Sequence, residues 1–155
     1  MADVHGPTKK VIFRVEGDEG QVNVETLWAF DLGNDRYRLD NTPFYAYSVS
    51  LGDVVRATTD ENGGFPTFRA VLKKSGNRTV RVFFDDPVDP GSASERLLNE
   101  LVDLGCEYEG ANKRYVAITI PPRVQLAAVR DFLVENALTW EHADPSYTEL
   151  YPNEA

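Results

Sequence analysis

Residues 78–84 read RTVRVFF and residues 92–105 read SASERLLNELVDLG, and these two stretches decide the fold of the second half of the chain. In the first stretch apolar and polar residues alternate, which is typical of a strand buried on one face. In the second, Ser92 with Glu95 three residues later is a capping-box pattern, apolar residues then recur at helical spacing, and Gly105 ends the run. A strand followed by an amphipathic helix is therefore predicted.

The pattern continues toward the C-terminus. A hairpin, a second helix and a short strand are predicted over residues 106–120, 123–136 and 138–142. The resulting order, βαββαβ, is that of ferredoxin-like folds, in which two right-handed crossovers place both helices on one face of a four-stranded antiparallel sheet. We therefore expect a ferredoxin-like half over residues 76–146 and a loosely held tail over residues 147–155.

The first half, residues 1–75, consists of short runs of alternating apolar and polar residues that are broken by glycine, asparagine, aspartate and proline. The expected strands span residues 10–15, 22–32, 36–40, 44–48, 53–59 and 66–74. Strands of this length and spacing predict a small antiparallel β-barrel or a curled sheet, so the whole chain is expected to be an α+β protein. Residues 75–77 (SGN) resemble a tight hairpin turn, which leaves open whether the two halves share a strand.

Composition restricts the class of protein. The chain has 155 residues, of which 42% are hydrophobic, with one cysteine and two histidines. No stretch approaches the roughly 18 apolar residues of a membrane-spanning helix, and the first ten residues have no apolar region of the secretory type. One cysteine and two histidines cannot complete a closed zinc site. We therefore expect a cytoplasmic protein with no membrane segment, no metal and no cofactor.

The charge balance points away from polyanions. Twenty-five acidic residues against sixteen basic ones give a net charge of −9, which repels phosphate backbones and anionic lipids and favours basic partners. The basic residues are scattered pairs without an aromatic series between them. We therefore expect no nucleic acid as a partner, and a basic protein as the more natural one.

The acidity is concentrated in the second half, where residues 76–155 hold seven basic and fourteen acidic side chains, a net charge of −7. Asp103 and Glu135 fall in the last turns of the two predicted helices, where the helix dipole disfavours an anion. Asp131 and Glu135 are also like charges four residues apart. Together with Glu100 they predict one negative patch on the helices, although a need for solubility would explain the same residues.

A second candidate site is a pocket in the first half. The polar residues Asn41 and Asp53 lie close in sequence to Phe44, Tyr45 and Tyr47, and a carboxylate beside such aromatic rings could act as a general base. The alternative is that these segments are turns and that the aromatic side chains pack the barrel.

Cys106 and His142 are the pair to test for nucleophilic catalysis. In the expected strand order they fall on opposite edges of the sheet, roughly 14 Å apart, which is too far for a hydrogen bond. We therefore expect a half-buried cysteine and a surface histidine without a catalytic role. His5 lies near the N-terminus and is less promising still.

Several motifs together resemble a bacterial family. They are residues 25–28 (ETLW), 37–44 (YRLDNTPF) and 49–55 (VSLGDVV), and the similarity extends through residues 76–79 (GNRT) to residues 140–141 (WE). As a set they resemble the family catalogued as domain of unknown function 4265. The resemblance implies a compact, bacterial, cytoplasmic protein, and it implies no catalytic residues.

Three functional hypotheses follow. The first is a non-catalytic, acidic protein-binding module of the immunity, antitoxin or regulator type, whose partner is a basic protein. The second is a small-molecule enzyme or sensor that uses the pocket around Asn41, Tyr45, Tyr47 and Asp53. The third is a structural subunit that associates with itself through a free sheet edge. The sequence leaves the oligomeric state open.

Overall fold

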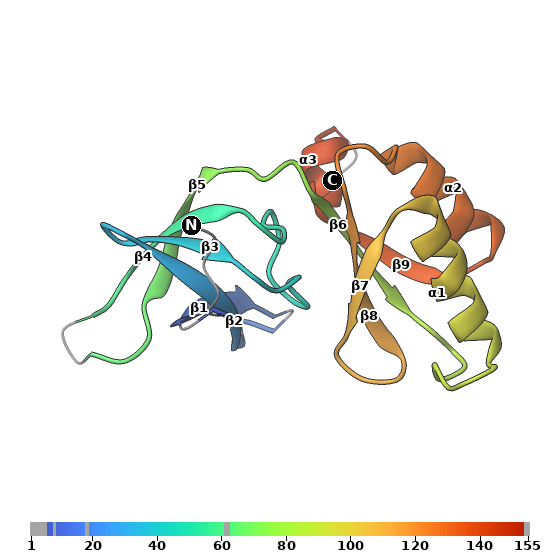
Figure 1. Cartoon of the computed structure of the whole chain (residues 1–155), viewed down its shortest axis with the longest axis horizontal. Coiled ribbons are helices and arrows are strands. Elements are labelled where there is room, and N and C mark those ends of the chain that lie inside the picture. Colours follow the sequence, from blue (N-terminus) through green and yellow to red (C-terminus); the bar gives the residue numbers. More distant parts are fainter. Residues whose placement is uncertain (1–5, 8, 18, 61–62, 154–155) are drawn as a thin grey trace.

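A computed structural model describes residues 6–7, 9–17, 19–60 and 63–153, and it shows an α+β molecule with two sheets side by side (Figure 1). One sheet is a closed barrel and the other is a four-stranded sheet whose outer face carries two helices. The chain passes once from the first sheet to the second, through residues 74–77. Each half therefore keeps its own set of strands.

The barrel contains β1 (Lys9–Glu16), β2 (Val22–Gly33), β3 (Arg36–Leu39), β4 (Val54–Thr58) and β5 (Thr67–Lys73). Successive strands pair antiparallel, and β5 closes the barrel by pairing parallel with β1 through Ile12 and Thr67. Alternate side chains point inward, as the sequence pattern predicted. The buried residues are Val11, Phe13, Leu27, Ala29, Tyr37, Leu39, Ala46, Val49, Val55 and Ala57. Of the two predicted forms, the structure has the barrel.

A tight hairpin turn joins β2 to β3. Gly33, Asn34 and Asp35 have φ angles of 83°, 57° and 61°, in the left-handed region that glycine and asparagine accept most readily. Asp31 supports the turn by accepting a hydrogen bond from the Gly33 N–H at 2.9 Å.

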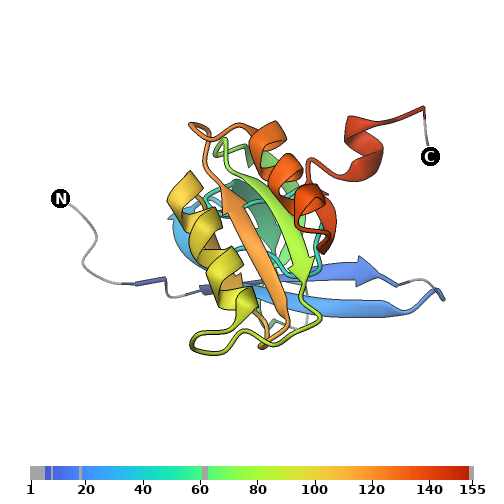
Figure 2. The same cartoon turned by 90° about the vertical axis from the view of Figure 1, so that its right-hand side faces the viewer.

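The second half contains β6 (Arg78–Phe83), α1 (Ala93–Leu104), β7 (Glu107–Gly110), β8 (Tyr115–Ile120), α2 (Leu126–Glu135) and β9 (Thr139–Asp144). The strands lie in the order β7-β8-β6-β9 and all pairs are antiparallel. The predicted element order is thus the observed one. Both helices cover the face turned away from the barrel (Figures 1 and 2). Their apolar sides pack on Val80, Val82, Ile118 and Ile120 of the sheet.

Local chemistry explains the helix ends. The Ser92 side chain caps α1 by accepting from the Glu95 N–H at 3.0 Å, while the Glu95 carboxylate accepts from the Gly91 N–H, so only half of the capping box forms. Gly105 ends α1 with a φ of 113°. The second helix begins at Leu126, three residues later than predicted, because the preceding residues form a separate turn in which Val124 N–H donates to Pro121.

Three sequence expectations are corrected. Residues 44–48 form no strand, since the N–H groups of Phe44, Tyr45 and Ala46 donate to the Glu25 carboxylate instead of to a neighbouring strand. Residues 75–77 do not join β5 and β6 as a hairpin, and the halves share no strand, because each of these strands pairs within its own sheet.

The third correction concerns the tail. Part of the expected tail is regular structure, because Tyr147–Leu150 form the short helix α3 behind a complete capping box of Ser146 and Glu149. The Ser48 hydroxyl also donates to Glu149 at 2.5 Å, which ties α3 to the first half. Residues 154–155, like His5, lie outside the described part of the chain. Among the described helices none is both long and apolar enough to cross a membrane.

Candidate functional site

The long loop between β3 and β4, residues 40–53, fills the space between the barrel and the second sheet, and we call it the junction loop. Glu25 holds it from the barrel side. This carboxylate is 7% exposed, and it accepts from the N–H groups of Phe44 at 2.6 Å, Tyr45 at 3.1 Å and Ala46 at 2.9 Å. Three donors to one buried carboxylate satisfy its charge and determine the shape of the loop.

Arg81 of β6 holds the junction loop from the sheet side. Its side chain is 1% exposed, and its guanidinium donates to the carbonyls of Ala46 at 2.9 Å, Pro43 at 3.3 Å and Tyr45 at 3.4 Å. It also forms an ion pair with Glu141 of β9 at 2.9 Å. The charge and the N–H groups of this buried arginine are thus paired within the protein, which indicates a structural role.

The structure brings only three of the five predicted pocket residues together. Phe44, Tyr45 and Tyr47 line a hollow of about 180 Å³, whose other lining residues include Arg81, Tyr115 and Glu141. The hollow lies where the junction loop meets the sheet. The rings of Tyr45 and Tyr115 stack in it, with centroids 5.8 Å apart.

Asn41 and Asp53 lie elsewhere and serve the fold. Asn41 Oδ1 accepts from the Trp28 N–H at 2.8 Å. Asp53 is fully buried and accepts from the Ser50 and Ser75 N–H groups, at 2.9 and 2.8 Å, and from Lys74 Nζ at 2.6 Å. Because its oxygens are occupied by these donors, Asp53 is not placed to remove a proton from a substrate.

The two tyrosine hydroxyl groups near this hollow already donate hydrogen bonds within the protein. Tyr115 donates to the Phe44 carbonyl at 2.5 Å, and burial raises its pKa to about 12. Tyr47 donates to Glu141 at 2.7 Å, and burial together with that carboxylate raises its pKa. Both tyrosines are therefore neutral near pH 7, and the arrangement suits binding better than acid–base chemistry.

Cys106 and His142 lie at opposite edges of the sheet, as predicted, since Cys106 immediately precedes β7 and His142 belongs to β9. Both are buried, which corrects the expectation of a half-buried cysteine and a surface histidine. Burial raises the pKa of the Cys106 thiol to about 11. Burial also lowers the pKa of His142, whose ring packs edge-on against Trp140. The two side chains form no catalytic pair.

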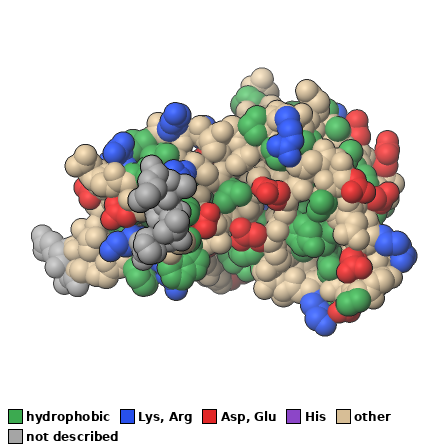
Figure 3. All heavy atoms as spheres, viewed as in Figure 1, with side chains coloured by type: hydrophobic (Ala, Val, Ile, Leu, Met, Phe, Trp, Pro, Cys, Tyr) green, Lys and Arg blue, Asp and Glu red, His purple; other side chains and the backbone are tan. Residues whose placement is uncertain are grey.

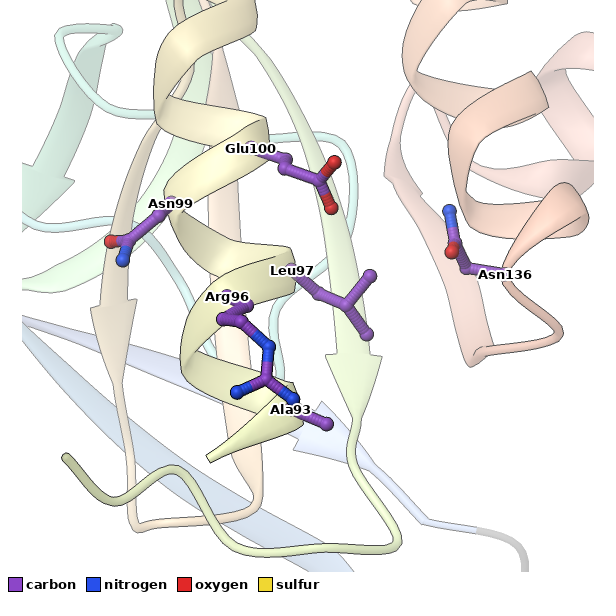
Figure 4. A pocket seen from close by; sticks show the side chains of 6 residues that line it. All are labelled: Ala93, Arg96, Leu97, Asn99, Glu100 and Asn136. Carbon is purple, nitrogen blue, oxygen red and sulfur yellow. The ribbon is translucent and has the colours of Figure 1, made fainter. Parts of the chain in front are cut away.

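The four predicted acidic residues of the helix face are all exposed, and they are spread along two helices. Glu100 lines a groove of about 660 Å³ between α1 and α2, where it faces the neighbouring helix (Figure 4). Asn136, just after α2, lies across this groove from Ala93 and Arg96 at the start of α1. The two helices therefore run in opposite directions, so the ends that carry Asp103 and Glu135 lie apart.

Basic side chains interrupt this acidic face. Arg96 lines the groove together with Glu100, and Arg130 pairs with Asp131 at 3.3 Å. Figure 3 shows red and blue side chains mixed at the end of the molecule that the helices cover. Of the four acidic residues only Glu100 lines the groove, and basic side chains separate the acidic ones on the helix face.

Sequence reasoning missed a group of hollows along β9. One of about 430 Å³ is lined by Arg130, Val134, Trp140, His142, Tyr147 and Tyr151. A second, of about 480 Å³, lies beside it at Tyr47, Glu141 and Tyr147. The spacing of Tyr147 and Tyr151 on one face of a helical turn was the available signal, and it was hidden by the expectation of a loose tail. No group of three or more histidine, cysteine, aspartate or glutamate side chains that could hold a metal ion occurs in the part of the chain that the structure describes.

The geometry defines a class of protein: an α+β molecule in which a five-stranded barrel is joined through a polar loop to a helix-covered sheet. A known family matches most of the length of the chain. Residues 25–142 match the family described as "Domain of unknown function (DUF4265)", and the chain belongs to that family.

A solved structure has the same fold. It is a crystal structure of a hypothetical protein from Neisseria gonorrhoeae, which is 18% identical and superposes with a TM-score of 0.77 over 92% of this chain and 99% of the other. At this identity the similarity concerns the fold alone. No curated protein matches the sequence.

Proposed function

We propose that this protein is a non-catalytic binding module that receives a basic segment of a partner protein in the groove between α1 and α2. The observation that carries the proposal is the composition of this groove. Ala93 and Leu97 supply apolar surface, and Glu100 supplies a carboxylate at its side (Figure 4). Arg96 also lines the groove, and its guanidinium donates to the Gly91 carbonyl at 2.9 Å. An aliphatic side chain with a cationic end, such as lysine or arginine, complements the apolar surface and the carboxylate.

The charge distribution supports this partner chemistry. The half of the chain that carries the groove has a net charge of −7, and neither helix has a basic residue in its last turn. Asp103 and Glu135 therefore oppose the helix dipoles at a cost of about 0.3–1 kcal/mol each. Immunity proteins, antitoxins and regulators are modules in which such a surface would be used.

Association kinetics test the proposal. The probe is a fluorescent, blocked peptide of alternating lysine and leucine, mixed with the full chain at low and at about 0.5 M salt. Salt should slow association much more than it speeds dissociation, because exposed charges mainly steer the encounter. The double reversal Glu100→Lys and Glu135→Lys should slow association at least tenfold.

The matched control is the double reversal Glu16→Lys and Glu19→Lys, which changes the same charge at exposed positions of the barrel. This control should bind within twofold of the parent. Equal loss in both variants would mean that only net charge matters, and unchanged binding of the groove variant would remove the groove from consideration.

A second candidate function is the binding of a small molecule at Tyr45 and Tyr47. The hollow lined by Phe44, both tyrosines and Glu141 supports it. Because Asp53 is occupied by its own hydrogen bonds, a sensor is favoured over an enzyme at this place.

Two further points belong to the proposal. We assign residues 76–146 to a ferredoxin-like unit and residues 1–75 to the barrel half, which the strand order β7-β8-β6-β9 and its antiparallel pairing support. We also assign the protein to the bacterial cytoplasm, since its single cysteine is free.

A further inference from the structure

The outer edge of β9 is open. This strand pairs with β6 on one side, and no strand within the described residues pairs with Thr139–His142 on the other. An unpaired strand edge presents N–H and C=O groups that can bind another strand. Proteins commonly block such edges with proline, lysine or a bulge, and residues 139–142 contain neither proline nor lysine and precede the register shift of β9.

Hollows lie on both faces of this edge. Strand alternation places Trp140 and His142, the partners of Val82 and Val80, on the helix side. There the hollow of about 430 Å³ is walled by their rings, by Tyr151 and Val134, and by Arg130, which is paired with Asp131. Thr139 and Glu141 are on the barrel side, where a hollow of about 190 Å³ includes Phe83 and Tyr115.

The exposed apolar residues of the region gather around the same edge. Val134 is 61% exposed, Tyr147 is 49% exposed and Phe83 is 46% exposed. His142 also lines the helix-side hollow, and its side chain is buried against Trp140.

The open edge of β9 ends at Ala143. The Ser48 N–H donates to the Ala143 carbonyl at 2.8 Å, and Ala143 bridges to Ser146 before α3. The open part is therefore limited to about four residues, the length of a short peptide strand and not of an extended sheet interface.

We propose that the β9 edge binds an extended segment of another protein, which adds to the sheet as a fifth strand. Main-chain hydrogen bonds to residues 139–142 would supply affinity, and neighbouring side chains of the segment would enter the two hollows alternately. The larger, aromatic hollow accommodates a tyrosine, and the smaller one an aliphatic residue. This surface is separate from the groove between α1 and α2. The proposal of strand binding therefore does not depend on the proposal that the groove binds a partner.

The occupant is a segment of positive charge and not a second copy of this chain. Two copies would each bring a net charge of −9 to the contact, whereas a basic segment is attracted by that charge. Oligomerisation through this edge is therefore the competing outcome that the experiment must separate.

The test uses the full chain and a blocked peptide with the sequence Lys-Thr-Tyr-Leu-Thr-Lys, in which the adjacent tyrosine and leucine point to opposite faces. Binding should slow amide hydrogen exchange at residues 139–142 at least tenfold. The other sheet edge, β7, serves as the internal control and should be unchanged. The same peptide with methylated backbone nitrogens should bind at least tenfold more weakly.

A pair of exposed valines provides the variant and its control. Val134→Asp, in the helix-side hollow, should weaken peptide binding at least tenfold, and Val102→Asp, exposed on α1, should leave binding unchanged. The proposal is overturned if the methylated peptide binds equally well, if protection appears at β7, or if exchange at residues 139–142 slows with protein concentration in the absence of peptide, which would show self-association.

Discussion

Two charged side chains, Glu25 and Arg81, connect the halves of the molecule through the junction loop. The first accepts three loop N–H groups and the second donates to three loop carbonyls. Glu25 belongs to the motif at residues 25–28, but the sequence assigns neither residue a role in the loop, because each is an ordinary strand position. Their roles depend on partners that lie 19–21 and 35–38 residues away.

Replacing Arg81 with leucine should lower the free energy of unfolding by about 2–5 kcal/mol, because the buried carbonyls of Pro43 and Ala46 would lose their donor. Arg14 is an exposed arginine on a strand and serves as control. Arg14→Leu should stay within about 0.5 kcal/mol of the parent. Urea denaturation followed by circular dichroism measures both, and equal stability of the two variants would contradict the role assigned to Arg81.

Cys106 should react slowly with alkylating reagents. Burial raises its thiol pKa to about 11, so at pH 8 the reactive thiolate is about a hundredfold scarcer than in an exposed cysteine of ordinary pKa. Mass spectrometry of the native chain after treatment with iodoacetamide should show this lag, and the urea-unfolded chain should react at the rate of a free thiol. Rapid modification of the native chain would indicate an activated cysteine.

At the scale of elements, sequence patterns succeeded wherever the decisive contacts are local. The turn at Gly33–Asp35 and the C-terminal end of α1 follow from backbone conformations that glycine and asparagine adopt cheaply. The strand predicted for residues 44–48 is absent. Their alternating pattern fits a strand, but the N–H groups of residues 44–46 donate to the carboxylate of Glu25, which is distant in sequence. A periodic pattern therefore identifies a buried face without specifying its hydrogen-bond partners.

Gly105→Ala and Gly91→Ala should separate backbone strain from steric conflict. Both glycines have positive φ angles, 113° and 79°, so either alanine should cost about 1–2 kcal/mol. A Cβ at Gly105 would also lie 2.8 Å from Val124 Cγ2, whereas one at Gly91 meets nothing within 4 Å. Thermal or urea unfolding should show a further loss of about 1–3 kcal/mol for Gly105→Ala alone. Equal costs would mean that Val124 moves aside freely.

At the scale of the whole molecule, a polar interface joins the barrel to the sheet. Thr42 and Thr119 hydroxyls lie 2.7 Å apart, Ser50 donates to Asp144 at 2.6 Å, and Lys74 contacts both Asp53 and Asp144 at 2.6 Å. Buried polar groups of this kind are satisfied only while both halves are folded and docked. Cooperative unfolding of the two halves follows from this arrangement.

The two tryptophans report on this cooperativity, because Trp28 lies in the barrel and Trp140 in the sheet. Unfolding curves of the single-tryptophan variants Trp140→Phe and Trp28→Phe should coincide with each other and with circular dichroism. Adding Ser50→Ala and Lys74→Met to each should separate the two transitions. Curves that already differ without these changes would show that the halves unfold independently.

Lys74 predicts an alkaline limit to stability. Burial lowers its pKa, but hydrogen bonds to the carboxylates of Asp144 and Asp53 have the greater combined effect, and the pKa rises above the ordinary value of 10.5. The raised pKa stabilises the folded chain fully below pH 10.5, and this contribution disappears as the pH rises through the folded-state pKa. Unfolding free energies at pH 8 and pH 11 should differ more in the parent than in Lys74→Met.

The sequence by itself determined the element order of the second half, the short strands of the first half, the separation of Cys106 from His142 and the family, because periodicity, turn residues and motifs are properties of neighbouring positions. The tertiary structure alone decided the course of the junction loop, the removal of Asn41 and Asp53 from the pocket, the groove at Glu100 and the open edge of β9. Each of these depends on side chains that are distant along the chain and meet only after both sheets have packed. Pairwise contacts of that kind leave no periodic trace in a single sequence.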